Sequence, residues 1–171
     1  MKGLTSFEIL HHEKGRFGNQ LFRIGTLIGE SLKKNTEYFV PREWEHCSLF
    51  PNLKNVISVN EIKNQITSVH RESNFGFHNI PETNGILEIV GYYQSWKFFE
   101  SYENEVRESL SFPQELIERA SSRMSKDTTK LCVHIRWGDI YDRKTQGGHK
   151  GVENYHPVMT LQYYENAINF I

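Results

Sequence analysis

Residues 6–40 carry the pattern that most restricts how this chain can fold, because a strand, a glycine-containing turn, a helix and another strand follow one another. Residues 6–11 predict the first strand and residues 38–40 the second, which Pro41 closes. Between them, apolar side chains recur at helical spacing, at Leu21, Ile24, Ile28 and Leu32. Two strands joined by a helix are the unit of a parallel sheet. We therefore predict an α/β fold with a Rossmann-like parallel sheet.

The remaining segments alternate between clear periodicity and less regular stretches. Asn19 is the predicted N-cap of the first helix. Residues 42–84 predict loops, short helices and one strand, with no internal repeat. Periodicity then predicts strands over 86–90 and 131–136, and helices over 95–110, 113–124 and 161–171. In the helix over 113–124, three apolar residues are expected to face inward, namely Leu116, Ile117 and Ala120.

A polar connection over residues 126–129 is the predicted junction between two domains. Residues 1–126 would form an N-terminal α/β domain, and residues 127–171 the start of a second domain. The final helix stops within an apolar phrase that no Gly, Pro or basic cap follows. We therefore expect this second domain to be incomplete.

Composition excludes several broad classes of function. The formal net charge of −1 over 171 residues gives no general attraction to nucleic acid. No run of about 18 apolar residues is present, so we expect a soluble or cytoplasmic protein. A membrane or Golgi location would require an anchor in a segment that the sequence lacks. Cys47 and Cys132 are far apart in the sequence and are expected to be free thiols.

The strand predicted over 131–136 ends in side chains that suit an anion. His134 and Arg136 would project from the same face, and Gly138 and Asp139 follow in the turn. A guanidinium holds two phosphate oxygens at once, and Asp139 is close enough to orient it. This spacing fits a phosphate site, and it fits equally a salt bridge between Arg136 and Asp139 at a sheet edge.

The turn over residues 15–20 is the second candidate binding segment. Glycines allow close approach of the backbone to a ligand, and a helix N-terminus offers free amides to an anion. Arg16 would add a positive charge beside Phe17, Gly18 and Asn19. The same residues also fit an ordinary turn between a strand and a helix, in which Gly18 serves backbone geometry.

The segment over residues 91–95 follows another predicted strand. Tyr92, Tyr93 and Gln94 can hydrogen-bond a sugar or a base, and a tyrosine ring can stack on one. The alternative is a strand end whose tyrosines pack with their hydroxyls in water.

The sequence predicts no metal site and identifies no general base. His149 and His156 lack metal-ligand spacing with any cysteine or acidic residue. Asp142 and Glu153, the nearby carboxylates, have no visible partner that would raise their pKa into the range of a general base.

Together these three segments resemble the galactoside α-1,2-fucosyltransferases, glycosyltransferase family 11. Members open with a strand and a Gly-Arg-x-Gly-Asn-Gln-Leu-Phe phrase, which residues 15–22 match. A Gly-Tyr-aromatic-Gln-Ser phrase matches residues 91–95, and a His-x-Arg-Arg-Gly-Asp signature matches residues 134–139. The second arginine of that signature is Trp137 here, and the family continues beyond the point where this chain stops.

The resemblance implies a fold related to the two-domain GT-B type. It also implies transfer of L-fucose from GDP-fucose to the 2-hydroxyl of a galactoside, with inversion and without a metal or other cofactor. His134, Arg136, Gly138 and Asp139 would bind the donor diphosphate, and residues 16–19 would approach the donor from the opposite wall. Tyr92, Tyr93 and Gln94 are the possible substrate contacts, and a sugar nucleotide and a galactoside glycan are the expected partners.

Two alternatives remain open. The chain could be a non-catalytic, truncated remnant that binds a sugar nucleotide weakly or not at all, a reading favoured by Trp137 and the abrupt end. It could also resemble a protein O-fucosyltransferase, since those enzymes share the Gly-Arg-Phe-Gly-Asn-Gln turn and an arginine-bearing strand. The phrase over residues 91–95 favours the galactoside branch.

Overall fold

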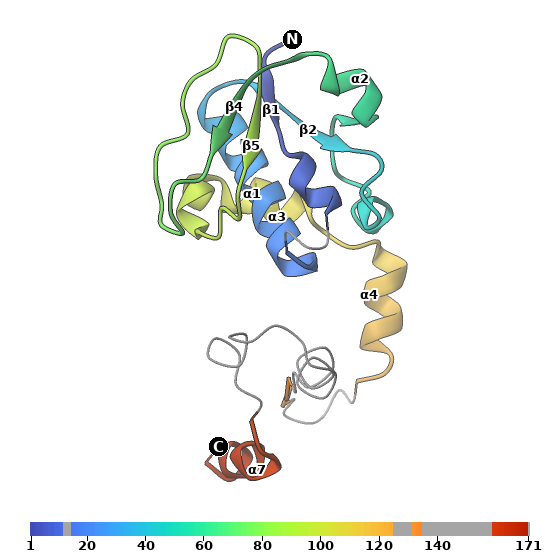
Figure 1. Ribbon diagram of the computed structural model, residues 1–171. Coiled ribbons are helices and arrows are strands. Elements are labelled where there is room, and N and C mark those ends of the chain that lie inside the picture. Colours follow the sequence, from blue (N-terminus) through green and yellow to red (C-terminus); the bar gives the residue numbers. More distant parts are fainter. Residues whose placement is uncertain (12–14, 125–130, 135–158, 171) are drawn as a thin grey trace, which may run out of the picture. The chain divides into compact units, whose positions relative to one another are not determined.

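A computed structural model describes residues 1–11, 15–124, 131–134 and 159–170 (Figure 1). The chain divides into two compact units, Met1–Met124 and Ser125–Ile171.

The first unit is built on a parallel sheet of five strands in the order β3-β2-β1-β5-β4. The strands are β1 (Gly3–Thr5), β2 (Glu37–Pro41), β3 (Val56–Ile57), β4 (Ile66–Arg71) and β5 (Ile86–Val90). The chain runs from β1 towards β3 on one side, and then adds β4 and β5 on the other. This α/β architecture with an all-parallel, Rossmann-like sheet confirms the predicted fold class, and the strands over 38–40 and 86–90 are confirmed with it.

The first strand was predicted in the wrong place. β1 ends at Thr5, and Phe7–Leu10 form a 3-10 helix, η1, instead of a strand over 6–11. The alternation of apolar and polar residues fits either geometry over so short a stretch. The 3-10 turn buries Ile9 completely, and the carboxylate of Glu8 accepts a hydrogen bond from the Gly91 amide. Tertiary contacts therefore decide the conformation of this segment.

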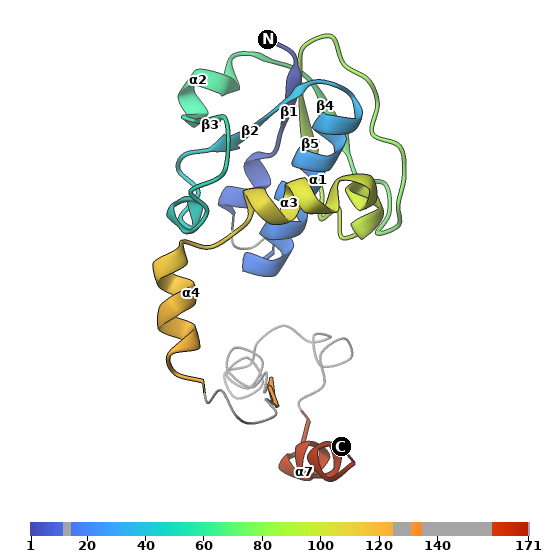
Figure 2. The same cartoon turned by 180° about the vertical axis from the view of Figure 1, so that it is seen from behind.

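The helix α1 (Phe17–Lys33) confirms the periodicity of residues 17–33, and its inner face includes the fully buried Ile24 and Leu27. It packs against β1 and β2, and α3 (Glu103–Ser109) packs against α1 (Figure 1 and Figure 2). The N-cap is Arg16, so the prediction of Asn19 as cap was wrong. Asn19 lies in the first turn, where its side chain contacts another segment.

The helix predicted over 95–110 is interrupted. Two 3-10 turns, η4 (Trp96–Phe98) and η5 (Glu100–Tyr102), precede α3. Phe99 lies between them with φ of −133°, and its backbone and side chain press against α1 at Gly29. A Cβ atom at Gly29 would lie 2.5 Å from Cβ of Phe99. Phe99 thus contacts α1 closely at the point where the two 3-10 turns meet.

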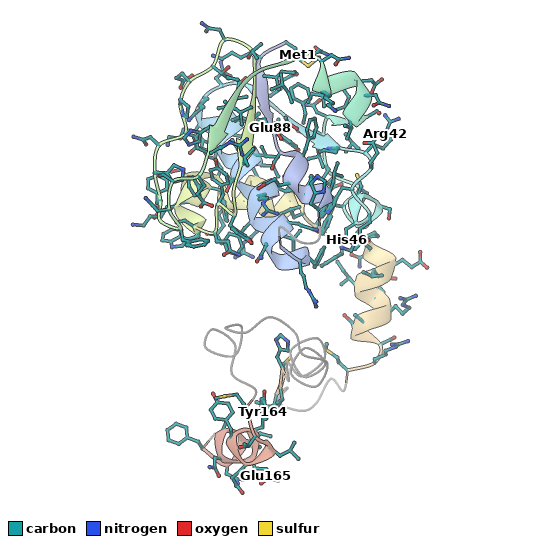
Figure 3. The ribbon with its side chains drawn as sticks, viewed as in Figure 1. Met1, Arg42, His46, Glu88, Tyr164 and Glu165 are labelled. Carbon is teal, nitrogen blue, oxygen red and sulfur yellow. The ribbon has the colours of Figure 1, made fainter. Side chains whose placement is uncertain are left out.

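The opposite face of the sheet holds a smaller apolar cluster. Phe39, Ile86 and Ile62 of α2 (Val59–Lys63) are buried together there. Ser58 caps α2 in a capping box with Glu61. Glu88 of β5, labelled in Figure 3, is in register with Phe39 across β1 and shares this face.

The helix α4 (Gln114–Ser121) confirms the helical pattern after Pro113 but not the expected burial. None of its residues is buried, and Ile117 is 44% exposed. The prediction that Leu116, Ile117 and Ala120 face inward was therefore wrong in this respect. Helical spacing defines an apolar stripe, whereas the surface that covers the stripe depends on tertiary structure.

In the second unit, α7 (Leu161–Asn169) confirms the final helix over most of its predicted length. Its N-cap is Thr160, whose hydroxyl accepts a hydrogen bond from the Tyr163 amide. Residues 131–134 form no strand and are all exposed, so the first part of the strand predicted over 131–136 is not found. Among the described residues, no helix is both long and apolar enough to cross a membrane.

Candidate functional site

The candidate site lies at the carboxyl ends of β1, β4 and β5. The strand order changes direction beside β1, because the chain continues from β1 to β2 on one side and reaches β5 on the other only later. Open α/β sheets bind their ligands in the crevice at such a switch point. Here the segments that leave the three strand ends, which begin at Ser6, Glu72 and Gly91, come together.

Two carboxylates hold the turn that follows β5. Glu8 accepts a hydrogen bond from the Gly91 amide at 2.7 Å. Glu72 accepts from the amides of Tyr92 at 2.6 Å and Tyr93 at 3.0 Å. Gly91 has a φ of +148° and Tyr93 a φ of +50°, conformations that L-residues seldom adopt. The carboxylates therefore maintain a strained turn through charge-assisted hydrogen bonds.

Arg23 of α1 lies under the same turn with its side chain fully buried. Its Nε donates to the Gly91 carbonyl at 2.5 Å, and Nη1 donates to the Glu8 carbonyl at 3.4 Å. Nη2 is 4.0 Å from Oε2 of Glu8, and the guanidinium carbon is 5.2 Å from the centre of the Tyr92 ring. Burial lowers the pKa of Arg23, and the Glu8 carboxylate opposes that shift. A guanidinium keeps its charge in such surroundings.

Glu8, Arg23 and Glu72 were not among the site residues predicted from the sequence. A signal for Arg23 was present, because it lies four residues before Leu27 and thus on the apolar stripe of α1. A cation on a buried stripe requires a partner, which indicates a buried network. Glu8 and Glu72 carried no comparable signal, since their roles depend on the return of the chain at Gly91.

A direct contact joins two of the three predicted binding segments. The side-chain amide of Gln94 donates a hydrogen bond to Oδ1 of Asn19, although the two residues are 75 positions apart. The predicted sites over residues 16–19 and 92–94 therefore meet at one edge of the sheet. Nothing in the spacing of either segment predicted this contact.

The N-terminus of α1 remains partly open around this contact. Arg16 and Gly18 are exposed, and a Cβ atom placed on Gly18 would meet no atom within 4 Å. Phe17 is half-buried, and its ring packs edge-on against His46 with 4.7 Å between centroids. Phe17 thus anchors the first turn of α1, whereas Gly18 leaves space beside it.

The three residues proposed to contact substrate occupy different environments. Gln94 is exposed and Tyr92 is half-buried. Tyr93 has no exposed surface, and its hydroxyl donates to the His70 carbonyl at 3.1 Å. Burial raises the pKa of Tyr93, and the neighbouring Glu72 raises it further. Tyr93 is a core residue here, which leaves Tyr92 and Gln94 as the residues of this segment that a ligand can reach.

One hollow borders the turn over residues 91–95, and a second lies beside the first turn of α1. A pocket of about 330 Å³ lies between the turn and the start of the β4–β5 loop, and Glu8, Glu72, Phe75 and Tyr92 contribute to its wall. A mostly apolar groove of about 480 Å³ includes Gly18, Phe22, Trp96 and Phe99. Each hollow is therefore lined in part by a segment that was predicted to bind a ligand.

The third predicted segment has only one described member. His134 is exposed, whereas Arg136, Gly138 and Asp139 lie outside the described residues, as do Trp137, Asp142, His149, Glu153 and His156. Within the described part of the chain, no group of three or more His, Cys, Asp or Glu side chains could hold a metal ion. Cys47 is half-buried and Cys132 exposed, and both are free thiols.

Comparison of the chain with protein-family models, with curated proteins and with solved structures found no match.

Proposed function

We propose that this protein is a glycosyltransferase that moves L-fucose from GDP-fucose to the 2-hydroxyl of a galactoside, with inversion and without a metal. The single observation that carries the proposal is the hydrogen bond between Asn19 and Gln94. Two phrases that resemble family 11 fucosyltransferases are far apart in the sequence and share one edge of a parallel sheet. As part of the same proposal, this sheet corresponds to one half of a GT-B enzyme.

The chemistry requires positive charge where the diphosphate departs, because negative charge develops there as the sugar becomes oxocarbenium-like. The first turn of α1 offers backbone amides and the positive end of the helix dipole. Arg16 is the residue next to these amides, and the space at Gly18 allows a ligand to approach them. His134, Arg136, Gly138 and Asp139 remain the donor-binding residues that the resemblance implies.

The decisive experiment is calorimetric titration of the full chain with GDP, together with transfer of radiolabelled fucose from GDP-fucose to lactose. We expect GDP to bind and Arg136→Ala to abolish binding, because no second signature arginine is present to replace it. The matched control is Arg119→Ala, which removes an exposed arginine of α4 that lines neither of the two hollows described above. This control should bind GDP like the parent chain.

The outcomes separate the alternatives. Binding and transfer to lactose support the galactoside enzyme, and transfer to a folded protein acceptor alone supports a protein O-fucosyltransferase. GDP binding that depends on Arg136, without transfer to either acceptor, identifies a non-catalytic sugar-nucleotide-binding protein. Absence of GDP binding by the intact chain contradicts the proposed function.

A further inference from the structure

The pocket between the turn after β5 and the loop after β4 has the size and lining of a small-molecule site. Its volume of about 330 Å³ lies at the lower end of the roughly 300–1,000 Å³ range of such sites. It opens at the carboxyl ends of β4 and β5, next to the switch point of the sheet. The strained turn at Gly91 forms one wall, so the backbone on that side is fixed before any ligand arrives.

An exposed aromatic ring borders this pocket. Phe75 is 72% exposed, and its ring centre is 5.8 Å from that of Tyr92 at an angle of 43°. Arg23 lies against the Tyr92 ring, so Tyr92 is held in place whereas Phe75 keeps most of its surface in solvent. The C–H face of a pyranose ring packs well on such an aromatic surface, because it is apolar while the hydroxyls point outward.

The polar groups of the pocket favour a ligand that donates hydrogen bonds. Glu8 and Glu72 each offer about four acceptor positions as carboxylates. The Gly91 amide occupies one position on Glu8, and the amides of Tyr92 and Tyr93 occupy two on Glu72. Positions therefore remain for hydroxyl donors, and Ser73 and Asn74 add further polar atoms to the wall.

The local charge argues against an anionic ligand. Among the described residues that line the pocket, two are carboxylates and none is a cation. Arg23, buried behind the turn, compensates one of the two charges, so the described residues around the pocket sum to a net charge of −1. A phosphate in this pocket would meet an uncompensated carboxylate in surroundings of reduced dielectric, which is unfavourable.

We propose that this pocket binds a neutral hexopyranoside, with the sugar ring on Phe75 and its hydroxyls donating to Glu8 and Glu72. The assignment of this pocket to the galactoside acceptor rests on the proposed function. It would place the neutral acceptor and the anionic donor in different sites. The donor diphosphate would bind at the N-terminus of α1, where Gly18 lines the other hollow.

The test is a titration of the full chain with methyl β-D-galactopyranoside, without donor, in which saturation-transfer NMR measures the binding. In Phe75→Ala the affinity should fall about five- to tenfold, because an aromatic contact is lost from the binding surface. Phe75→Tyr keeps the ring and should bind like the parent chain. Phe77→Ala is the matched control, since Phe77 belongs to the same loop but packs against Phe98 rather than the pocket. Thermal melts verify that each variant is folded.

Three outcomes would overturn the inference. The first is that the sugar does not bind measurably, and the second is that the parent chain and folded Phe75→Ala bind the sugar equally well. The third is that the chain binds butylamine in preference to the sugar, which would indicate a cation site. Galactoside binding that depends on Phe75 supports the pocket even when GDP does not bind, and in that case only the proposed fucosyl transfer fails. GDP binding without galactoside binding overturns the assignment of the pocket but leaves the proposed donor site standing.

Discussion

The two glycine-containing segments at the edge of the sheet differ sharply in how the protein holds them. The turn over residues 91–95 is fixed by Glu8, Glu72 and the buried Arg23. The segment over residues 15–20 has an exposed Arg16 and open space at Gly18. The hydrogen bond between Asn19 and Gln94 joins them, so a rigid segment lies beside an open one.

This difference separates two uses of glycine in the same region. At Gly91 the backbone conformation and the close approach of Glu72 exclude a side chain. At Gly18 neither reason applies, since the residue is helical and a Cβ atom would meet no other atom. The first glycine serves the fold, whereas the second is free to serve a ligand. Substitutions can test this distinction.

The largest effect is expected for Arg23→Met. It leaves the Gly91 carbonyl and the Glu8 carboxylate without their buried cation. The free energy of unfolding should fall by about 3–4 kcal/mol, as for other buried pairs that lose one partner. Arg16→Met, at the open segment, should change it by less than about 0.5 kcal/mol. Urea denaturation measures both, and similar losses in the two variants would contradict the comparison.

Glycine-to-alanine substitutions should have a smaller effect on stability, and the effect should have opposite signs in the two segments. Gly91→Ala should destabilise the protein by about 2–3 kcal/mol because of its positive φ and a Cβ atom 2.3 Å from that of Glu72. Gly18→Ala should stabilise α1 by about 0.5–1 kcal/mol, since alanine is the better helix former.

Calorimetric titration of Gly18→Ala with GDP tests whether the space at Gly18 serves a ligand. If the space at Gly18 serves a ligand, Gly18→Ala should be more stable and yet bind GDP more weakly than the parent chain. A variant that is less stable than the parent would show instead that Gly18 is needed for the fold.

The smallest effect is expected for Glu88→Gln, on the strand that leads into the rigid turn. Burial raises the pKa of Glu88, and Glu8 raises it further, although the Phe7 backbone and Arg71 oppose the shift. Compared with the unfolded state, the folded state therefore favours the protonated carboxyl of Glu88. The stabilisation that comes from protonated Glu88 is fully present below the pKa of this group in the unfolded chain, about 4.3. It is lost as the pH rises through the higher pKa of Glu88 in the folded protein.

At pH 7, Glu88→Gln should therefore be more stable than the parent chain by about 0.5 kcal/mol. At pH 3 the two proteins should have the same stability. Thermal melts between these values measure the difference, with Glu115→Gln on the exposed α4 as a control for the loss of one negative charge. A gain that does not change with pH would show that ionisation of Glu88 has no part in it.

Much of the fold was predictable because it depends on local periodicity. The apolar spacing of Ile24 and Ile28 predicted α1, and the apolar run over residues 86–90 predicted β5. The predictions were wrong where packing overrides the local pattern. Residues 7–10 form a 3-10 helix that brings Glu8 to Gly91, and the turns around Phe99 adapt to α1 at Gly29.

The candidate site was predictable only in part. Residues 16–19 and 92–94 were selected by their residue types and their places beside strand and helix ends. Their meeting at Asn19 and Gln94 was not, and neither were the roles of Glu8 and Glu72. These contacts join residues that are distant in the sequence, and they leave no periodic signal.

By itself, the sequence determined the type of sheet, the position of its main helix and the two segments at its edge. These follow from propensities and spacings within about 20 residues, where backbone geometry links the pattern to the structure. Only the tertiary structure decided which segment is rigid and which is open. That distinction depends on charges from η1, α1 and the end of β4 that converge on one turn. The buried Arg23 pairs with partners that only the folded chain brings within reach.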